Sequence, residues 1–146
     1  MKKEKANQTV MPYYKLLGLE HVYLEDSYVL DIKTSENSIQ IFIEVVLTEE
    51  HPQYTPPLLG EQYCYRKADI FFSSVKKITW VKKNMRPYKD ALCETDYGNI
   101  DEFYLTNGHY YLSGDWGELE IISAPPVLTL TVGSGYKLEP TKNSAR

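Results

Sequence analysis

The sequence predicts a mainly β protein, an antiparallel β-sandwich or partly open barrel of about seven to eight strands with at most one or two short helices. Three observations support this fold class. Apolar and polar residues alternate with a period of two in several segments, and turn-forming residues separate these segments at short intervals. The chain also contains 13 tyrosines, and aromatic residues favour strands.

The length of 146 residues corresponds to one domain. We expect residues 1–9 to form a flexible N-terminal segment, residues 10–132 a single β-rich domain and residues 133–146 a polar tail. The first segment of the domain, Val10 to Leu19, has a proline near its start and a glycine near its end. Its length leaves a short helix and an edge strand equally open.

Residues 22–47 are predicted to form the first strand pair, with a turn at residues 34–38. In the first strand, alternation places three apolar side chains on a common face: Tyr28, Leu30 and Ile32. In the second strand, one face is almost purely aliphatic: Ile39, Ile41, Ile43, Val45 and Leu47. The β-branched residues of that face oppose a helix, so this is the best-defined strand of the chain.

A second strand pair is predicted at residues 62–73 and 75–82, joined at Ser73-Ser74. Two irregular segments flank this pair. Thr48 to Glu61 contains three prolines and a glycine, which predict a loop. In residues 83–100 the alternation stops, and we expect a long loop with one helical turn around Lys89 to Leu92.

The last third of the chain returns to short strands. We expect strands at 101–106, 110–113, 118–123 and 127–132. Asn107-Gly108 is a strong hairpin signal between the first two of these strands. Gly114-Asp115-Trp116-Gly117 forms the next turn, and we expect Trp116 to be an anchor over the sheet.

Charge and hydropathy exclude several classes of partner. The net charge of −4 disfavours nucleic acid and anionic membrane surfaces, which select basic proteins. No apolar run approaches the roughly 20 residues of a membrane span, and no apolar core of a secretory signal follows the basic N-terminus. Cys64 and Cys93 match no metal-binding spacing. We therefore expect a cytoplasmic protein with free thiols and without a cofactor.

No catalytic residues are predicted. The histidines His21, His51 and His109 are far apart and are interpreted as surface or loop residues, although a spatial site would not require proximity in sequence. Cys64 lies between two tyrosines and is expected to be a buried apolar residue. One loop carries the oxygen ligands that calcium prefers, but in no EF-hand spacing: Asp90, Glu94, Asp96, Asn99, Asp101 and Glu102. We interpret it as a solvated, turn-forming loop, with cation binding as the alternative.

The tyrosines can serve as cross-strand spacers or as part of a binding surface. Those in predicted loops have less structural reason to be aromatic. We therefore hypothesise that the proline-rich loop, residues 49–61, and the acidic loop, residues 90–101, bind a protein partner. The candidate partner-binding residues are Tyr54, Tyr88, Glu94, Asp96, Tyr97 and Asp101.

Two alternatives belong to other functional classes. One is a small-ligand or carbohydrate-binding domain with hydrolytic activity, in which Trp116, Tyr97 and Glu94 line a cleft. The other is a structural subunit that forms a homo-oligomer through an exposed aliphatic face.

The tract "ETDYGNIDEFY…YYLSGDWGELEIISAPPVLTL", about the last third of the chain, resembles small uncharacterised bacterial β-rich proteins. Some of these occur where immunity proteins of contact-dependent toxin systems are found. The resemblance implies an acidic, cytosolic, non-enzymatic binder and carries no catalytic residues with it. An acidic surface would suit a basic toxin through charge complementarity.

Overall fold

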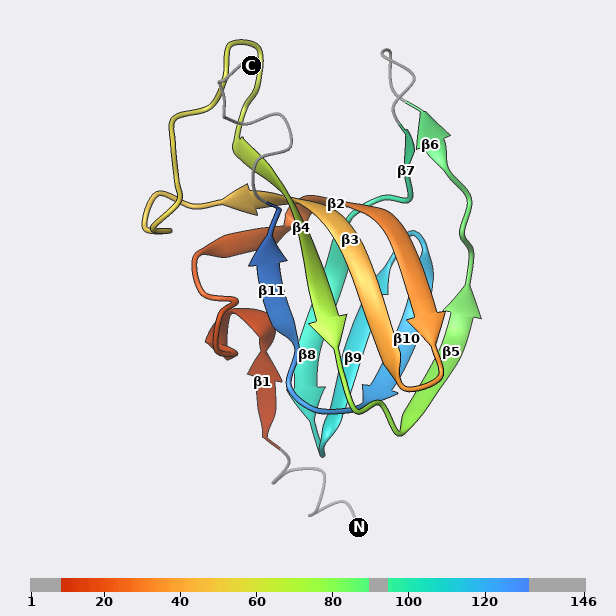
Figure 1. Ribbon diagram of the computed structural model, residues 1–146. Helices are drawn as coiled ribbons and strands as arrows, with labels where there is room; N and C mark the ends of the chain where they lie inside the picture. The colour runs from red at the N-terminus through yellow and green to blue at the C-terminus, as the bar shows by residue number, and fades with distance from the viewer. Residues whose placement is uncertain (1–8, 90–94, 132–146) are drawn as a thin grey trace.

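Two antiparallel sheets packed face to face form the body of the protein, and the structure, a computed structural model, describes residues 9–89 and 95–131 (Figure 1). The five-stranded sheet contains, in spatial order, β1 (Val10–Pro12), β8 (Ile100–Thr106), β9 (His109–Gly114), β10 (Gly117–Ile122) and β5 (Lys77–Lys83). The four-stranded sheet contains β11 (Val127–Leu130), β4 (Cys64–Phe72), β3 (Ser38–Leu47) and β2 (Val22–Ser35). A two-stranded ribbon adds β6 (Tyr88–Lys89) and β7 (Thr95–Asp96). The predicted mainly β, antiparallel fold class is confirmed.

The hairpins follow the sequence signals closely. All five aliphatic residues of the predicted face of β3 are at most 2% exposed, which confirms that face as core. The turn between β2 and β3 needs only Glu36 and Asn37, because Ser35 already pairs with Ser38. At the turn between β8 and β9, Asn107 and Gly108 both have positive φ, 51° and 75°. Two successive positive φ values are what a tight two-residue hairpin turn requires.

The prediction that residues 62–73 and 75–82 form a pair is wrong. β4 and β5 lie in different sheets, because the chain crosses from one layer to the other at Ser73-Ser74. Ser74 has a positive φ of 51° at this crossing. Alternation within a strand specifies which face is buried but not which sheet the strand joins, so two adjacent alternating segments look like a hairpin.

The predicted face of β2 is also wrong in part. Val29 is fully buried, whereas Tyr28 is 40% exposed. The pairing of β2 with β3 shifts register between Tyr23 and Tyr28 and again between Val29 and Asp31. Each shift leaves residues of β2 unpaired and changes whether its odd-numbered or its even-numbered side chains face the core. Val29 and Ile32 therefore both pack in the core, although regular alternation would place residues three positions apart on opposite faces.

Two segments outside the long strands have short, mixed structures. Val10 to Leu19 begins as edge strand β1, with Met11 opposite Leu105 of β8, and continues as the 3₁₀ helix η1 (Tyr13–Lys15). The expected helical turn at Lys89 to Leu92 is contradicted at Lys89, which pairs with Thr95 in the β6–β7 ribbon. The rest of that turn, and the terminal segments 1–8 and 132–146, lie outside the described residues.

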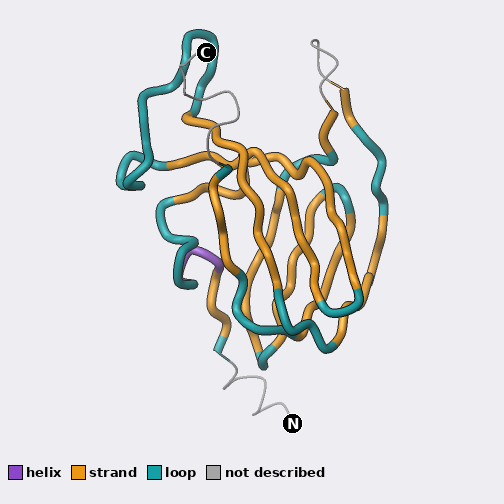
Figure 2. Tube along the Cα trace, in the orientation of Figure 1, coloured by secondary structure: helices purple, strands orange, loops and turns teal. Residues whose placement is uncertain are grey.

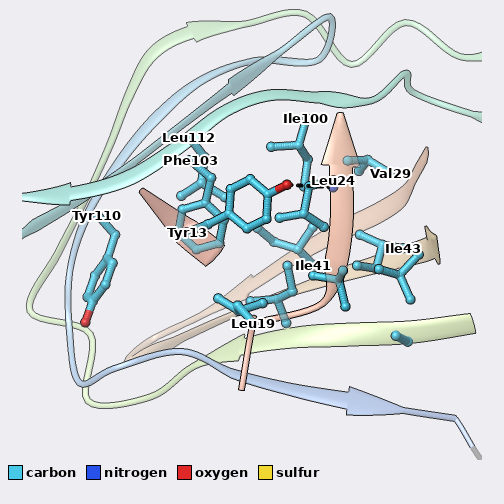
Figure 3. Packing of buried hydrophobic residues seen from close by; sticks show 14 of the residues in the cluster. Tyr13, Leu19, Leu24, Val29, Ile41, Ile43, Ile100, Phe103, Tyr110 and Leu112 are labelled. Carbon is cyan, nitrogen blue, oxygen red and sulfur yellow. Dashed lines mark hydrogen bonds between the residues drawn. The ribbon is translucent and has the colours of Figure 1, made fainter. Parts of the chain in front are cut away.

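Tyr13 brings η1 into the core between the two sheets (Figure 3). Its ring stacks on Phe103 with centroids 6.1 Å apart. Its hydroxyl oxygen accepts a hydrogen bond from the Leu24 backbone N–H at 3.1 Å, and the hydroxyl donates to Glu25 Oε1 at 2.7 Å. The Tyr13 hydroxyl thus provides an acceptor for the Leu24 backbone N–H, since Leu24 lies in the irregular part of β2 that is not paired with β3.

Trp116 is fully buried, which confirms it as an anchor. Its indole N–H donates to the Asn99 carbonyl at 3.0 Å, and its ring meets that of Trp80 edge to face at 6.3 Å. A fully buried indole lines no surface cleft, so the predicted cleft of Trp116, Tyr97 and Glu94 is wrong for this residue. The aliphatic face of β3 is likewise covered by the other sheet and offers no exposed surface for self-association.

The two ends of the sandwich differ. At one end, which we call the closed end, short connections are bonded to each other: Val75 N–H donates to the Asn37 carbonyl, Lys76 N–H to Ile122 and Ala124 N–H to Ser73, at 2.7–3.0 Å. The other end carries the proline-rich loop and the β6–β7 ribbon, and we call it the loop end (Figures 1 and 2).

Candidate interaction surface

The proline-rich loop, residues 49–61, is fixed at its base by Arg66. Its guanidinium donates to Cys64 Sγ at 2.8 Å, to the Gln53 carbonyl at 3.0 Å and to Thr55 Oγ1 at 3.2 Å. Tyr54 packs against the core, so the base of the loop belongs to the folded body. The guanidinium suits this task because its several donors are held in one plane.

The tip of the same loop is apolar and exposed. Leu58 is 70% exposed and Leu59 is completely exposed. The two neighbouring leucines therefore form an exposed apolar pair at the tip of a loop whose base is fixed, and contiguous exposed apolar surface is a feature of protein contact sites.

The β6–β7 ribbon leaves the body beside β2. Tyr97 N–H donates to the Val29 carbonyl at 2.8 Å, and Val29 N–H donates to the Gly98 carbonyl at 2.7 Å. Asp96 Oδ1 accepts the Gly98 N–H at 2.8 Å and closes the bend. Gly98 is required here because its φ is +95° and a Cβ would lie 2.8 Å from that of Asp115.

A groove of about 860 Å³ lies between this ribbon and the outer face of the four-stranded sheet. Tyr28, Glu44 and Lys67 line it from the sheet, and Tyr88 and Asp96 from the ribbon. Glu44 and Lys67 form an ion pair at 3.9 Å. A second groove of about 430 Å³ lies beside the proline-rich loop and includes Tyr54.

Tyrosines connect the two grooves across the sheet. Tyr23, Val46 and Tyr65 stand opposite one another on neighbouring strands, as do Tyr28, Glu44 and Lys67. The rings of Tyr28 and Tyr65 stack at 6.1 Å, and Tyr63 meets Tyr65 edge to face at 6.0 Å. We call Tyr23, Tyr28, Tyr63 and Tyr65 the tyrosine row.

Two members of the tyrosine row, Tyr63 and Tyr65, have raised pKa values, so their hydroxyls stay protonated. Burial, and next the neighbouring Tyr28, raise the pKa of Tyr65 above its ordinary value. A hydrogen bond to Asp26 is the main cause of the raised pKa of Tyr63. The row therefore presents rings with polar tips, a composition that is typical of protein interfaces.

The predicted binding residues divide into three groups. Tyr54, Tyr88 and Asp96 line the two grooves. Tyr97 packs against the core instead, and Asp101 is exposed on β8 but lines neither groove. Although the residue as a whole is exposed, partial desolvation of its carboxyl group, then the charges of Asp115, Glu102 and Glu25, raise the pKa of Asp101. Glu94 lies outside the described residues.

Sequence reasoning did not select the loop-tip leucines or the tyrosine row as binding residues. Leu58-Leu59 follows a diproline inside a segment predicted to be an exposed loop, so an apolar pair there was a detectable signal. The outward direction of Tyr28 was not detectable, because it depends on the register shifts of β2.

Two residues considered for chemistry, Cys64 and His51, have structural surroundings. Cys64 is 3% exposed, as predicted, whereas Cys93 lies outside the described residues. His51 Nδ1 accepts the Gln53 N–H at 3.0 Å, and burial is the main cause of its lowered pKa. Within residues 9–89 and 95–131, no three His, Cys, Asp or Glu side chains are grouped to hold a metal ion. In the same ranges no helix is long and apolar enough to cross a membrane.

The fold and the loop end together define an antiparallel β-sandwich with an aromatic and apolar surface at one end. No known family model, curated protein or solved structure matches the chain. The function is therefore inferred from the surface itself.

Proposed function

We propose that the chain is a non-catalytic, bacterial protein-binding module, immunity-like in style, that contacts its partner through the loop end. The exposed pair Leu58 and Leu59 supports this proposal most directly. The base of this loop is bonded to Arg66 at Gln53 and Thr55, which limits the conformational entropy that the loop would lose when a partner covers the pair.

The neighbouring surface has the composition of a protein interface. The tyrosine row lies between the loop and the ribbon, and it supplies rings of low conformational freedom. Carboxylates at the rim, including Asp96 and Asp101, would speed encounter with a basic partner rather than supply most of the affinity.

The first test replaces the two leucines. Full burial of one leucine contributes about 1.5–3 kcal/mol, so Leu58→Ser with Leu59→Ser should cost at least about 3 kcal/mol, or roughly 100-fold in Kd. Leu17→Ser is the control, because Leu17 is likewise strongly exposed, at 90%, but belongs neither to the proline-rich loop nor to the β6–β7 ribbon.

The wild-type protein and both variants are immobilised, and proteins retained from the source cell extract are identified by mass spectrometry. Each retained protein is then purified and its Kd is measured by calorimetry. The proposal requires a partner that loses affinity with the double variant and keeps it with Leu17→Ser. It is refuted if every purified partner binds all three proteins equally, or if none binds.

The second test concerns the acidic rim. Charge reversal by Asp96→Lys with Asp101→Lys should slow association with a basic partner several-fold at low salt, and the difference should shrink at high salt. Glu36→Lys, in the turn at the closed end, is the control. Unchanged association would exclude these two carboxylates from the binding surface.

A further inference from the structure

The outer face of the five-stranded sheet carries a second aromatic surface, separate from the loop end. Tyr104 of β8, Tyr111 of β9 and Glu120 of β10 stand opposite one another on neighbouring strands. In the adjacent row, Glu102, Ser113 and Glu118 are aligned in the same way. The alternate residues Phe103, Leu112 and Leu119 are at most 3% exposed, so the tyrosines and carboxylates point away from the core.

The two tyrosine rings form a platform. Their centroids are 5.0 Å apart and their planes are inclined by 35°. They line a groove of about 340 Å³ together with Thr106, His109 and Glu120. The side-chain oxygen of Thr106 is buried there and has no hydrogen-bond partner among the described residues.

Carboxylates surround this platform. Ser113 Oγ donates to Glu102 Oε1 at 3.1 Å, which orients that carboxylate. Glu118 lies 3.9 Å from Lys82 Nζ, and Glu120 lies 3.9 Å from His109 Nδ1. The side chain of Lys82 is 74% exposed, so its ion pair with Glu118 is solvated and weak.

The neighbouring carboxylates contribute to the raised pKa values of both tyrosines. Burial and then Glu118 raise the pKa of Tyr111 to about 12. Burial and then Glu102 raise the pKa of Tyr104. A cation placed over the rings would meet both the ring faces and this negative potential.

We propose that this platform binds arginine side chains of an extended basic segment in a protein partner. A planar guanidinium can stack on a tyrosine ring while its N–H groups reach carboxylates, which a lysine ammonium does less well. Glu118 and Glu120 lie two residues apart on one strand, about 6.8 Å. An extended Arg-x-Arg segment presents its side chains at the same spacing.

The probe is the peptide acetyl-Gly-Arg-Gly-Arg-Gly-amide, titrated into the full chain and followed by NMR of backbone amides. The same peptide with citrulline replaces the guanidinium by a neutral group of equal shape, and a third peptide carries lysine. We expect the arginine peptide to shift amides of β9 and β10, the lysine peptide to bind more weakly and the citrulline peptide to leave the spectrum unchanged.

Three variants locate the site. Tyr111→Leu should weaken binding about two- to fivefold, the effect of one exposed cation–π contact. Glu120→Gln should weaken it to a similar extent, whereas Glu36→Gln, which removes the same charge at the closed end, should leave it unchanged. Circular dichroism verifies that each variant is folded.

Equal binding of the arginine and citrulline peptides would overturn the proposal. Equal effects of Glu120→Gln and Glu36→Gln would also overturn it. Binding would then depend on the net charge of the protein and not on the position of Glu120. Equal binding of the lysine peptide would refute the preference for guanidinium. Tyr111 and Glu120 are not among the residues used in the loop-end proposal, so each outcome is independent of the partner proposed there.

Discussion

Replacement of Tyr13 by phenylalanine should destabilise the fold although it removes only one oxygen atom. The ring keeps its place against Phe103, but the buried Leu24 N–H loses its acceptor and Glu25 loses a donor. A buried backbone donor without a partner costs about 1–3 kcal/mol. Glu25 can turn to water, so we assign most of the loss to Leu24 and expect about 2 kcal/mol.

Equilibrium unfolding in urea, followed by circular dichroism, measures this loss. The midpoint should fall while the dependence of the unfolding free energy on urea stays the same, because both proteins expose the same surface. For a chain of this size the Tm should fall by roughly 4–8 °C. Tyr14→Phe is the matched control, because the neighbouring Tyr14 is 52% exposed. A loss below about 0.5 kcal/mol for Tyr13→Phe, or equal losses for both variants, would refute the reasoning.

Three further predictions follow from contacts described above. Gly98→Ala should lower the Tm more than Gly60→Ala, because both glycines have positive φ but only Gly98 meets another side chain, that of Asp115; equal effects would contradict the close approach. Asp101→Asn should raise the Tm slightly at pH 7. The pKa of Asp101 is higher in the folded state than its ordinary value of 3.8, so the stability that the protonated carboxyl group contributes is complete below pH 3.8 and is lost as the pH rises through the folded-state pKa. At pH 3 the carboxyl group is protonated in both states, so the Tm values of the variant and the wild type should converge there. Arg66→Met should accelerate proteolysis within the proline-rich loop while the global unfolding midpoint changes less, since Arg66 connects the loop base to β4; unchanged cleavage would show that other contacts fix the loop.

Local patterns predicted the fold class because the strongest signals are local. The aliphatic face of β3 and the Asn107-Gly108 turn each depend on a few adjacent residues, and both agree with the structure. The partner of β5 was not predictable, because Ser73-Ser74 fits a tight hairpin as well as a crossing between sheets. The inward direction of Val29 depends on register shifts that no alternation reveals.

The candidate surface was only partly predictable for a related reason. Tyr88 and Asp96 were found because they stand in a segment where alternation stops, and they line the larger groove. Tyr97 comes from the same segment but packs inward, because its backbone pairs with Val29. Sequence located this irregular segment, whereas the pairing of Tyr97 with β2 determined that its side chain packs inward.

The pairing of β1 with β8 has a consequence for synthesis of the protein. Met11 leaves the ribosome 94 residues before its partner Leu105. At about 5–20 residues per second the N-terminal strand waits roughly 5–20 s for its partner. Until then Tyr13 has no Phe103 to stack against, so the core stays open. We expect the emerging chain to need protection from aggregation during this interval.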